Sequence, residues 1–314
     1  MISKRRSFLK NSSILAGTVL FGKPLNTLAA SGKTPNKLST ELLKISHTGG
    51  LSGCINSGKG QFNELIRVNS LFRSTTISGL ILDSGNFLKK EGTQEDQLPM
   101  IAVMNKLGYH AVNVGEQELS MGQEHFAALL PSISFPLLNC NYDFSHSELS
   151  SRIKKYLVLK SGNLKIGITG LGAMVNIPGV AVSNPFKCVN EVAKMLKKEL
   201  NCDFVICLSQ LDDEHKKYDD QKLAAASEYI DLIIGSQEKK LMTNAKALQN
   251  AKKWAVYLSQ SASEGRTVGE MKFEFNHVNM VTGFHHRFNI SGAPNHLSPK
   301  DTYAALRRMA MRCA

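Results

Sequence analysis

The sequence predicts an α/β domain in which mixed β-sheets form a layered sandwich flanked by helices. Short runs rich in Val, Ile and Leu alternate along the chain with longer stretches whose apolar residues recur at helical spacing. Two hairpin patterns interrupt this alternation, which indicates mixed rather than purely parallel sheets. The chain has 314 residues, 42% of them hydrophobic and 20% charged, and contains no internal repeat. One folded domain of ordinary globular composition is therefore expected.

Each predicted element follows from a local pattern. Buried strands are predicted where apolar runs are short and bounded by turn residues, and helices where the apolar spacing is close to 3.6 residues. The hairpins turn at Gly162 and Asn163 and near 277–279, and Ser298 followed by Pro299 predicts the start of a last helix. The strand segments are 42–47, 77–83, 111–114, 135–140, 204–209 and 231–236, and the helical segments are 62–73, 94–109 and 190–200.

The N-terminal segment 1–30 has the three parts of a secretory signal. A basic stretch, SKRRSFLK, is followed by the apolar run ILAGTVLFG and by the small-residue stretch LNTLAASG. Arg5 and Arg6 make it a twin-arginine signal, which implies export of the folded chain to the periplasm or another extracytoplasmic space. The alternative is an ordinary amphipathic N-terminal helix.

The predicted signal sets the expected domain limits. Its apolar run is too short to anchor the chain in a bilayer, so cleavage near Ala29 or Ala30 is expected. Residues 31–40 are polar and predict a linker, 41–292 form the folded domain, and 293–314 form a C-terminal tail helix. No membrane span is expected after removal of the signal.

Charge and cysteine content exclude several classes of protein. The net charge is +12, but the first thirty residues contribute five basic residues and no acid. The remaining basic residues are dispersed and not interleaved with aromatic residues, so nucleic-acid binding is not expected. Six cysteines are present without a C-x-x-C pair, which argues against a zinc ribbon or a thioredoxin-type site.

Polar segments follow the predicted strands, where ligands bind in open α/β sheets. In order and spacing they resemble the motifs HTNDxHG, DxGD, NVGNHEFDxG, SHL and IIGGHTH of the calcineurin-like metallophosphoesterases, with the 5'-nucleotidases as the nearest branch. The resemblance covers 42–290 and implies a metallophosphoesterase-like sandwich. The segments are HTGGLSG (47–53), LDSGN (82–86), NVGEQELSMG (113–122), PLLNCNYDF (136–144), CLSQL (207–211) and DLIIGSQEK (231–239).

At every position where that family carries its chemistry, this sequence has a different residue type. The resemblance places one residue at the catalytic histidine that protonates the leaving group, and seven at metal ligands. Gln117 stands at the catalytic histidine. The seven ligand positions are Gly50 and Asn86 for aspartates, Ser52, Gln210, Gln237 and Lys239 for histidines, and Glu116 for an asparagine.

These substitutions predict that the metal site is lost. A two-metal centre needs a bridging anion and several imidazole or carboxylate donors. Glycine has no side-chain atom that can bind a metal, and side-chain amides do not neutralise the charge of the metal ions. The Lys239 ammonium repels a divalent cation. Only Glu116 could still hold metal. We therefore expect no cofactor, and a pseudoenzyme that binds an unknown small molecule or periplasmic protein.

Two alternatives to the pseudoenzyme remain open. The chain could be an active, metal-dependent, 5'-nucleotidase-like hydrolase whose divalent metal pair sits in a rearranged site built on Glu116, Glu118, Asp83 and nearby histidines. It could instead be a nucleotide-binding module without catalysis. Within the cleft, Lys239 is expected either to pair with Glu116 or to point into solvent with it.

Other polar residues are expected to have structural roles. His47, on a strand end, is interpreted as a satisfied structural histidine. The segment DDEHKKYDD (212–220) alternates in charge and predicts a solvated loop without function. His285 and His286 are adjacent on a predicted strand, so they face opposite ways and cannot share one ion.

Overall fold

The computed structural model describes residues 41–53, 79–211, 217–237, 244–265 and 267–290. The predicted signal, linker and last helix lie outside these ranges.

The first of the two large sheets has seven strands in the order β15-β14-β1-β2-β3-β4-β6. β1, β2, β3, β4 and β6 run parallel, β14 pairs antiparallel with β1, and β15 pairs antiparallel with β14. Their bounds are β1 Glu41–Thr48, β2 Leu80–Asp83, β3 Ala111–Asn113, β4 Leu137–Leu138, β6 Ile153–Lys154, β14 Thr267–Phe275 and β15 Val281–Ile290.

The second sheet has six strands in the order β12-β13-β11-β10-β8-β7. The four central strands are parallel and the two edge strands are antiparallel to their neighbours. A small third sheet pairs β5 (Tyr142–Phe144) with β9 (Val180–Val182). The bounds in the second sheet are β7 Tyr156–Ser161, β8 Leu164–Gly172, β10 Phe204–Gln210, β11 Leu232–Gln237, β12 Lys246–Gln249 and β13 Ala255–Ala262.

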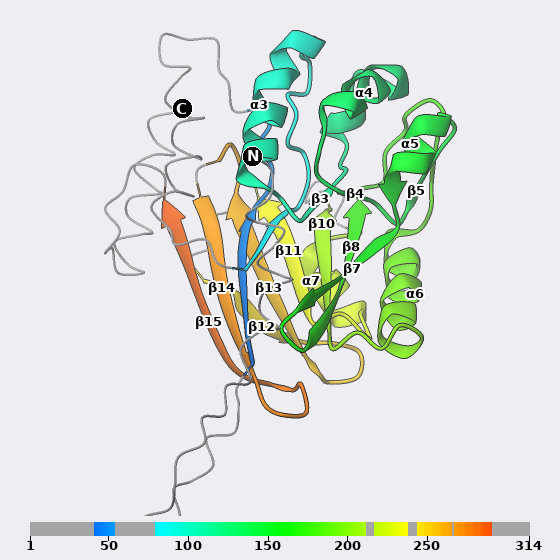
Figure 1. Cartoon of the computed structure of the whole chain (residues 1–314). Helices are drawn as coiled ribbons and strands as arrows, with labels where there is room; N and C mark the ends of the chain where they lie inside the picture. The colour runs from blue at the N-terminus through cyan, green and yellow to red at the C-terminus, as the bar shows by residue number, and fades with distance from the viewer. Residues whose placement is uncertain (1–40, 54–78, 212–216, 238–243, 266, 291–314) are drawn as a thin grey trace, which may run out of the picture.

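The two large sheets pack face to face over an apolar core (Figure 1). Leu43 and Ile45 of β1 contribute side chains from the first sheet, and Phe204 and Ile206 of β10 contribute side chains from the second. All four are at most 1% exposed. Burial of large apolar side chains between the sheets is the main force holding the layers together, at about 1.5–3 kcal/mol for each side chain.

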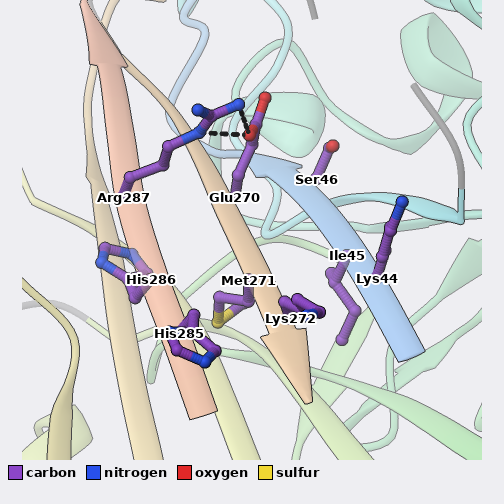
Figure 2. A pocket seen from close by; sticks show the side chains of 9 residues that line it. All are labelled: Lys44, Ile45, Ser46, Glu270, Met271, Lys272, His285, His286 and Arg287. Atoms are coloured by element: carbon purple, nitrogen blue, oxygen red, sulfur yellow. Dashed lines mark hydrogen bonds and ion pairs between the residues drawn. The ribbon is translucent and has the colours of Figure 1, made fainter. Parts of the chain in front are cut away.

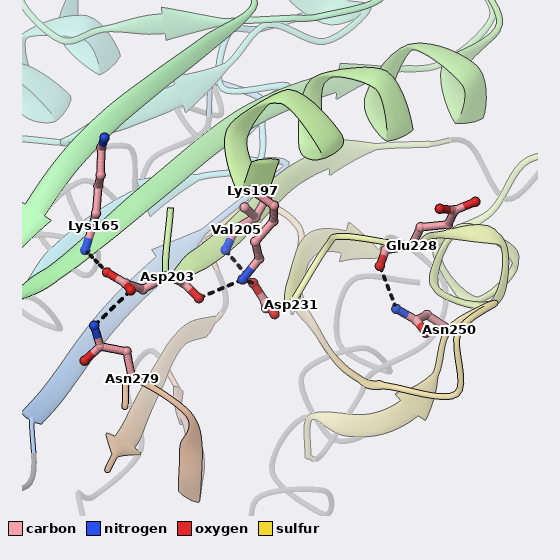
Figure 3. Close-up of polar contacts among 8 residues, drawn as sticks. All are labelled: Lys165, Lys197, Asp203, Val205, Glu228, Asp231, Asn250 and Asn279. Atoms are coloured by element: carbon pink, nitrogen blue, oxygen red, sulfur yellow. Dashed lines mark hydrogen bonds and ion pairs between the residues drawn. The ribbon is translucent and has the colours of Figure 1, made fainter. Parts of the chain in front are cut away.

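Helices cover the outer face of each sheet. α3 (Gln94–Leu107) and α4 (Gln123–Leu129) pack on the first sheet, while α6 (Pro185–Lys198) and α7 (Asp220–Ala226) pack on the second. α5 (Ser147–Arg152) contacts β5 and β6, and the short 3₁₀ turns η1 (Gln117–Leu119) and η2 (Leu130–Ser132) flank α4. Figure 3 shows how α6 is attached to the sheet: Lys197 Nζ donates to Asp231 Oδ2 and to the carbonyl of Asp203, both at 2.7 Å.

The predicted fold class, a sandwich of mixed sheets flanked by helices, is confirmed. The first hairpin turns at Gly162, whose φ of 60° suits a glycine. The helix predicted at 190–200 instead begins at Pro185, because Asn184 caps it by accepting a hydrogen bond from Lys187 N at 3.1 Å. Among the described residues, no helix has both the length and the apolar character needed to cross a membrane.

A buried polar link joins the two sheets near the strand ends. His47 Nε2 of β1 lies 2.8 Å from Ser259 Oγ of β13, which lies 3.0 Å from His286 Nε2 of β15. Burial lowers the pKa of His47 to about 3, helped by the neighbouring His286, and lowers the pKa of His286 to about 4. Both imidazoles are therefore neutral at pH 7. His285 is exposed on the opposite face of β15, as predicted from its adjacency to His286.

These lowered pKa values predict a loss of stability in acid. Below pH 6.5 the unfolded chain binds protons at both histidines and the native chain does not, so the free energy of unfolding falls as the pH falls towards 4. Each histidine should contribute a loss of about 2 kcal/mol between pH 7 and pH 5. His286→Asn should flatten the dependence of the unfolding free energy on pH, measured by urea denaturation. Equal slopes for the wild type and His286→Asn would contradict this account.

Candidate functional site

Five of the predicted positions come together beyond the carboxyl ends of the parallel strands. Gly50 and Ser52 follow β1, Asn86 follows β2, Gln117 follows β3 and Gln210 ends β10. The loops after β1 and β2 are joined through their backbones, with 2.8 Å bonds from Gly50 N to the Gly85 carbonyl and from Ser52 N to the Asn86 carbonyl. The two sheets thus present these residues at one edge of the sandwich.

The loop backbone at three of these positions is left-handed. The φ angles are 59° at Gly50, 52° at Ser52 and 56° at Asn86. For a residue with a Cβ this conformation costs about 1–2 kcal/mol, and it persists only where the surrounding structure enforces it. The turns after β1 and β2 therefore keep a specialised shape although the side chains they carry are small or neutral.

Glu118 helps to hold the loop after β2 in this conformation. Its carboxylate is 1% exposed and accepts hydrogen bonds from Gly115 N at 2.7 Å, Leu88 N at 3.0 Å and Asn86 N at 3.1 Å. Burial raises the pKa of Glu118, while the backbone N–H bonds oppose that rise by favouring the charged form. One buried side chain thus fixes the loop after β2 to the loop after β3.

The Gln210 carboxamide bridges the site from one sheet to the other. Its Nε2 donates to the Gly85 carbonyl at 2.8 Å and to Ser236 Oγ at 2.9 Å, and Ser236 Oγ also lies 3.2 Å from Gln210 Oε1. Gln210 is 9% exposed, so these contacts satisfy a buried amide. Ser236 was not among the residues predicted from the sequence. It stands at the second glycine of the family motif IIGGHTH, so it could have been recognised as a change paired with Gln210.

The Asn86 carboxamide fills the neighbouring space. Its Oδ1 accepts a hydrogen bond from Gln117 N at 3.1 Å, and it lies so close to Gly115 that a Cβ there would overlap it. The same Cβ would lie 3.0 Å from Gln210 Cγ. Two neutral amides therefore meet over Gly115 and hydrogen-bond to the surrounding loops.

Other family-like residues are also bound within the framework. Asp83 Oδ2 accepts from Thr48 Oγ1 at 2.5 Å, and Thr48 Oγ1 lies 2.7 Å from the Tyr109 hydroxyl. Burial raises the pKa of Asp83 to about 7. Asn139 and Asn141 hydrogen-bond to backbone groups around the ends of β3 and β8. These contacts hold Thr48, Asp83, Asn139 and Asn141 within the framework of the loops.

The prediction of a solvated loop over 212–220 is wrong at its last residue. Asp220 begins α7, is 5% exposed, and accepts from Ser209 Oγ at 2.6 Å and from Gln260 Nε2 at 2.7 Å. Asp219 before it caps the helix by accepting from Lys222 N. The start of a helix favours acidic residues, because its free backbone N–H groups and the helix dipole stabilise negative charge. Asp219 and Asp220 therefore lie at the start of α7 and not in a solvated loop. His215 lies outside the described residues.

The described side chains do not fit a two-metal centre. Nowhere in the described ranges do three His, Cys, Asp or Glu side chains converge as metal ligands would. Glu116 is exposed, and the carboxyl groups of Glu118 and Asp83 are engaged with backbone and hydroxyl donors. The Gln237 side chain and all of Lys239 lie outside the described residues, so their roles and the Glu116–Lys239 pair stay predictions.

A separate hollow of about 390 Å³ lies on the face of the first sheet, at β1, β14 and β15 (Figure 2). Arg287 and Glu270 form an ion pair within it at 2.6 Å. None of the predicted site residues lines it. The hollow is lined by Lys44, Ile45, Ser46, Glu270, Met271, Lys272, His285, His286 and Arg287.

The packing over Gly115 predicts a measurable coupling with Asn86. Gly115→Ala should lower the free energy of unfolding by about 1–3 kcal/mol, because its new methyl group overlaps Asn86 Oδ1. In an Asn86→Gly background, which also suits the left-handed backbone, the same change should cost less. Chemical denaturation of the wild type, both single variants and the double variant measures this coupling. Strictly additive effects would show that the two residues do not meet.

The chain is similar in fold to known proteins, but its sequence identity to them is low. No family model matches the chain. It is 23% identical over 257 residues to the trifunctional nucleotide phosphoesterase protein YfkN of Bacillus subtilis, covering 69% of this chain and 17% of that protein. The chain therefore spans less than a fifth of the length of this curated relative.

Solved structures match most of the chain. A 5'-nucleotidase precursor from Thermus thermophilus superposes with a TM-score of 0.66 at 20% identity, covering 86% of this chain and 59% of that one. The Haemophilus influenzae NAD nucleotidase gives 0.65 at 19%, covering 87% and 56%. The calcineurin-like phosphoesterase YfkN of Bacillus subtilis gives 0.63 at 18%, covering 87% and 99%. The chain thus has the calcineurin-like phosphoesterase fold that these proteins share.

Proposed function

We propose that this chain is an exported pseudoenzyme of the calcineurin-like phosphoesterase and 5'-nucleotidase family that binds a ligand or protein at the strand ends and does not hydrolyse phosphate esters. The observation that supports it is the presence of two hydrogen-bonded neutral amides at this edge. Gln210 spans from the Gly85 carbonyl to Ser236, and Asn86 bonds to Gln117 N, where the family resemblance places metal ligands.

The electrostatics of this network oppose a metal pair. Two divalent cations would bring four positive charges to a region whose bridging groups are neutral amides and a serine. Buried charge without a compensating anion is strongly unfavourable. Seating the ions would also break the hydrogen bonds that Gln210 makes with the Gly85 carbonyl and with Ser236. No metal or other cofactor is therefore part of the proposed function.

The rim of the site has features suited to binding. Met121, in the loop after β3, is 50% exposed, and Met174, in the loop after β8, is 40% exposed. Exposed Glu116 adds a negative charge to the first of these loops. Methionine side chains adapt to varied surfaces, and loops held by a rigid scaffold commonly carry binding residues. The proposed partner is a small molecule or a periplasmic protein.

Purified chain should show no metal-dependent turnover. We expect AMP and bis(4-nitrophenyl) phosphate to be hydrolysed no faster than in a protein-free blank with manganese, zinc or cobalt, because the donors for a dinuclear centre are absent from the described site. Elemental analysis of the same protein should find no stoichiometric metal. Chelator-sensitive turnover that Glu116→Gln abolishes would contradict the proposal and support the active hydrolase with a rearranged site.

Export is tested independently of the site. Changing Arg5 and Arg6 together to lysine should retain the precursor in the cytoplasm of a bacterium with a twin-arginine pathway, because that pathway depends on the arginine pair. Immunoblotting of periplasmic and cytoplasmic fractions measures this. Changing Lys4 and Lys10 to arginine, which keeps the charge and the arginine pair, is the control. Unchanged periplasmic yield of the variant without the arginine pair would contradict twin-arginine export.

A further inference from the structure

An aromatic cluster lies at the edge of the second sheet opposite the candidate site. Tyr229 precedes β11 and Trp254 precedes β13, so both stand at the amino ends of parallel strands. Trp254 is the single tryptophan of the chain and is 56% exposed. Its ring centroid lies 6.5 Å from that of Tyr229, and the two rings are inclined at 72°.

The turn that carries Trp254 is held in a fixed conformation. Buried Asn250 accepts hydrogen bonds on Oδ1 from Lys252 N and Trp254 N, both at 2.9 Å. Its Nδ2 donates to the Glu228 carbonyl at 3.3 Å, as Figure 3 shows. Lys253 has a left-handed φ of 62° within the same turn. A strained, internally bonded turn presenting an exposed aromatic ring is a preorganised arrangement, which reduces the entropy lost on binding.

Ammonium groups surround the two rings. Lys252 Nζ lies 3.6 Å from the Tyr229 centroid and 5.4 Å from the Trp254 centroid, and it pairs with Glu228 at 3.0 Å. Lys198 Nζ of α6 lies 5.7 Å from the Tyr229 centroid. Because Lys252 is balanced by Glu228, the positive charge of Lys198 remains available to an anion beside the rings.

We propose that Trp254, Tyr229, Lys252 and Lys198 form a binding site for an acidic sugar, in which a sugar ring stacks on Trp254 and its carboxylate lies among the lysines. The steep angle between the rings gives no parallel slot for a planar aromatic ligand. The exposed indole of Trp254 instead suits stacking against the C–H face of a sugar ring. Charged groups at the edge, Glu228 and Lys252, can bond its hydroxyl groups.

The single tryptophan makes the site directly measurable. Tetragalacturonate added to the purified full chain should change the Trp254 fluorescence saturably, and the affinity should fall with added salt because the contact is partly ionic. Neutral galactotetraose, with similar rings and no carboxylates, should bind at least about tenfold more weakly. Free galacturonate tests whether a single acidic ring suffices or an oligosaccharide is required.

Variants separate the stacking and ionic contributions. By calorimetry, Trp254→Ala should weaken tetragalacturonate binding about tenfold or more, and Trp254→Phe should restore part of it. Lys198→Ala should weaken binding and reduce its salt dependence. Lys194→Ala, an exposed lysine one turn earlier on α6, is the control and should have no effect. The proposal would be overturned if tetragalacturonate did not bind, if the neutral sugar bound equally well, or if Trp254→Ala kept the wild-type affinity. Binding of only an aromatic nucleotide or an acidic peptide would also overturn it.

Discussion

The hydrogen bonds of the Gln210 carboxamide are the interaction on which the rest of the candidate site depends. They connect the loop after β2 in the first sheet to β11 in the second, through the Gly85 carbonyl and Ser236. A buried amide is stable only when its donors and acceptors are satisfied, so this bridge restricts what else can occupy the space. The bridging groups themselves, an amide and a hydroxyl, bring no charge to this edge.

The framework around this bridge is held by other residues. Glu118 fixes two loops through three backbone N–H groups, and His47 connects the sheets through Ser259. Glu118 bonds Asn86 N within one left-handed turn, and Ser52 N in the other bonds the Asn86 carbonyl. Under the proposed function, the shape of the site and its chemistry belong to different side chains, so one can be kept while the other is lost.

The sequence predicted the layers of the fold well, since buried strands such as 204–209 are unbroken apolar runs whose burial needs two covered faces. It predicted the edges of elements less well. The start of α6 depended on the Asn184 cap, and burial of Asp220 depended on Ser209 and Gln260, which are remote in sequence. The Gln210–Ser236 bond joins two strands and has no local sequence pattern, so Ser236 was not predicted as the partner of Gln210.

The central claim is that neutral amides occupy the place of a dinuclear centre, and anomalous diffraction from crystals soaked in manganese tests it most directly. The account predicts no paired anomalous peaks at the strand ends, with Gln210 still bonded to Gly85 and Ser236. Two peaks about 3.5–4 Å apart at that edge, with the Gln210 side chain displaced, would contradict it.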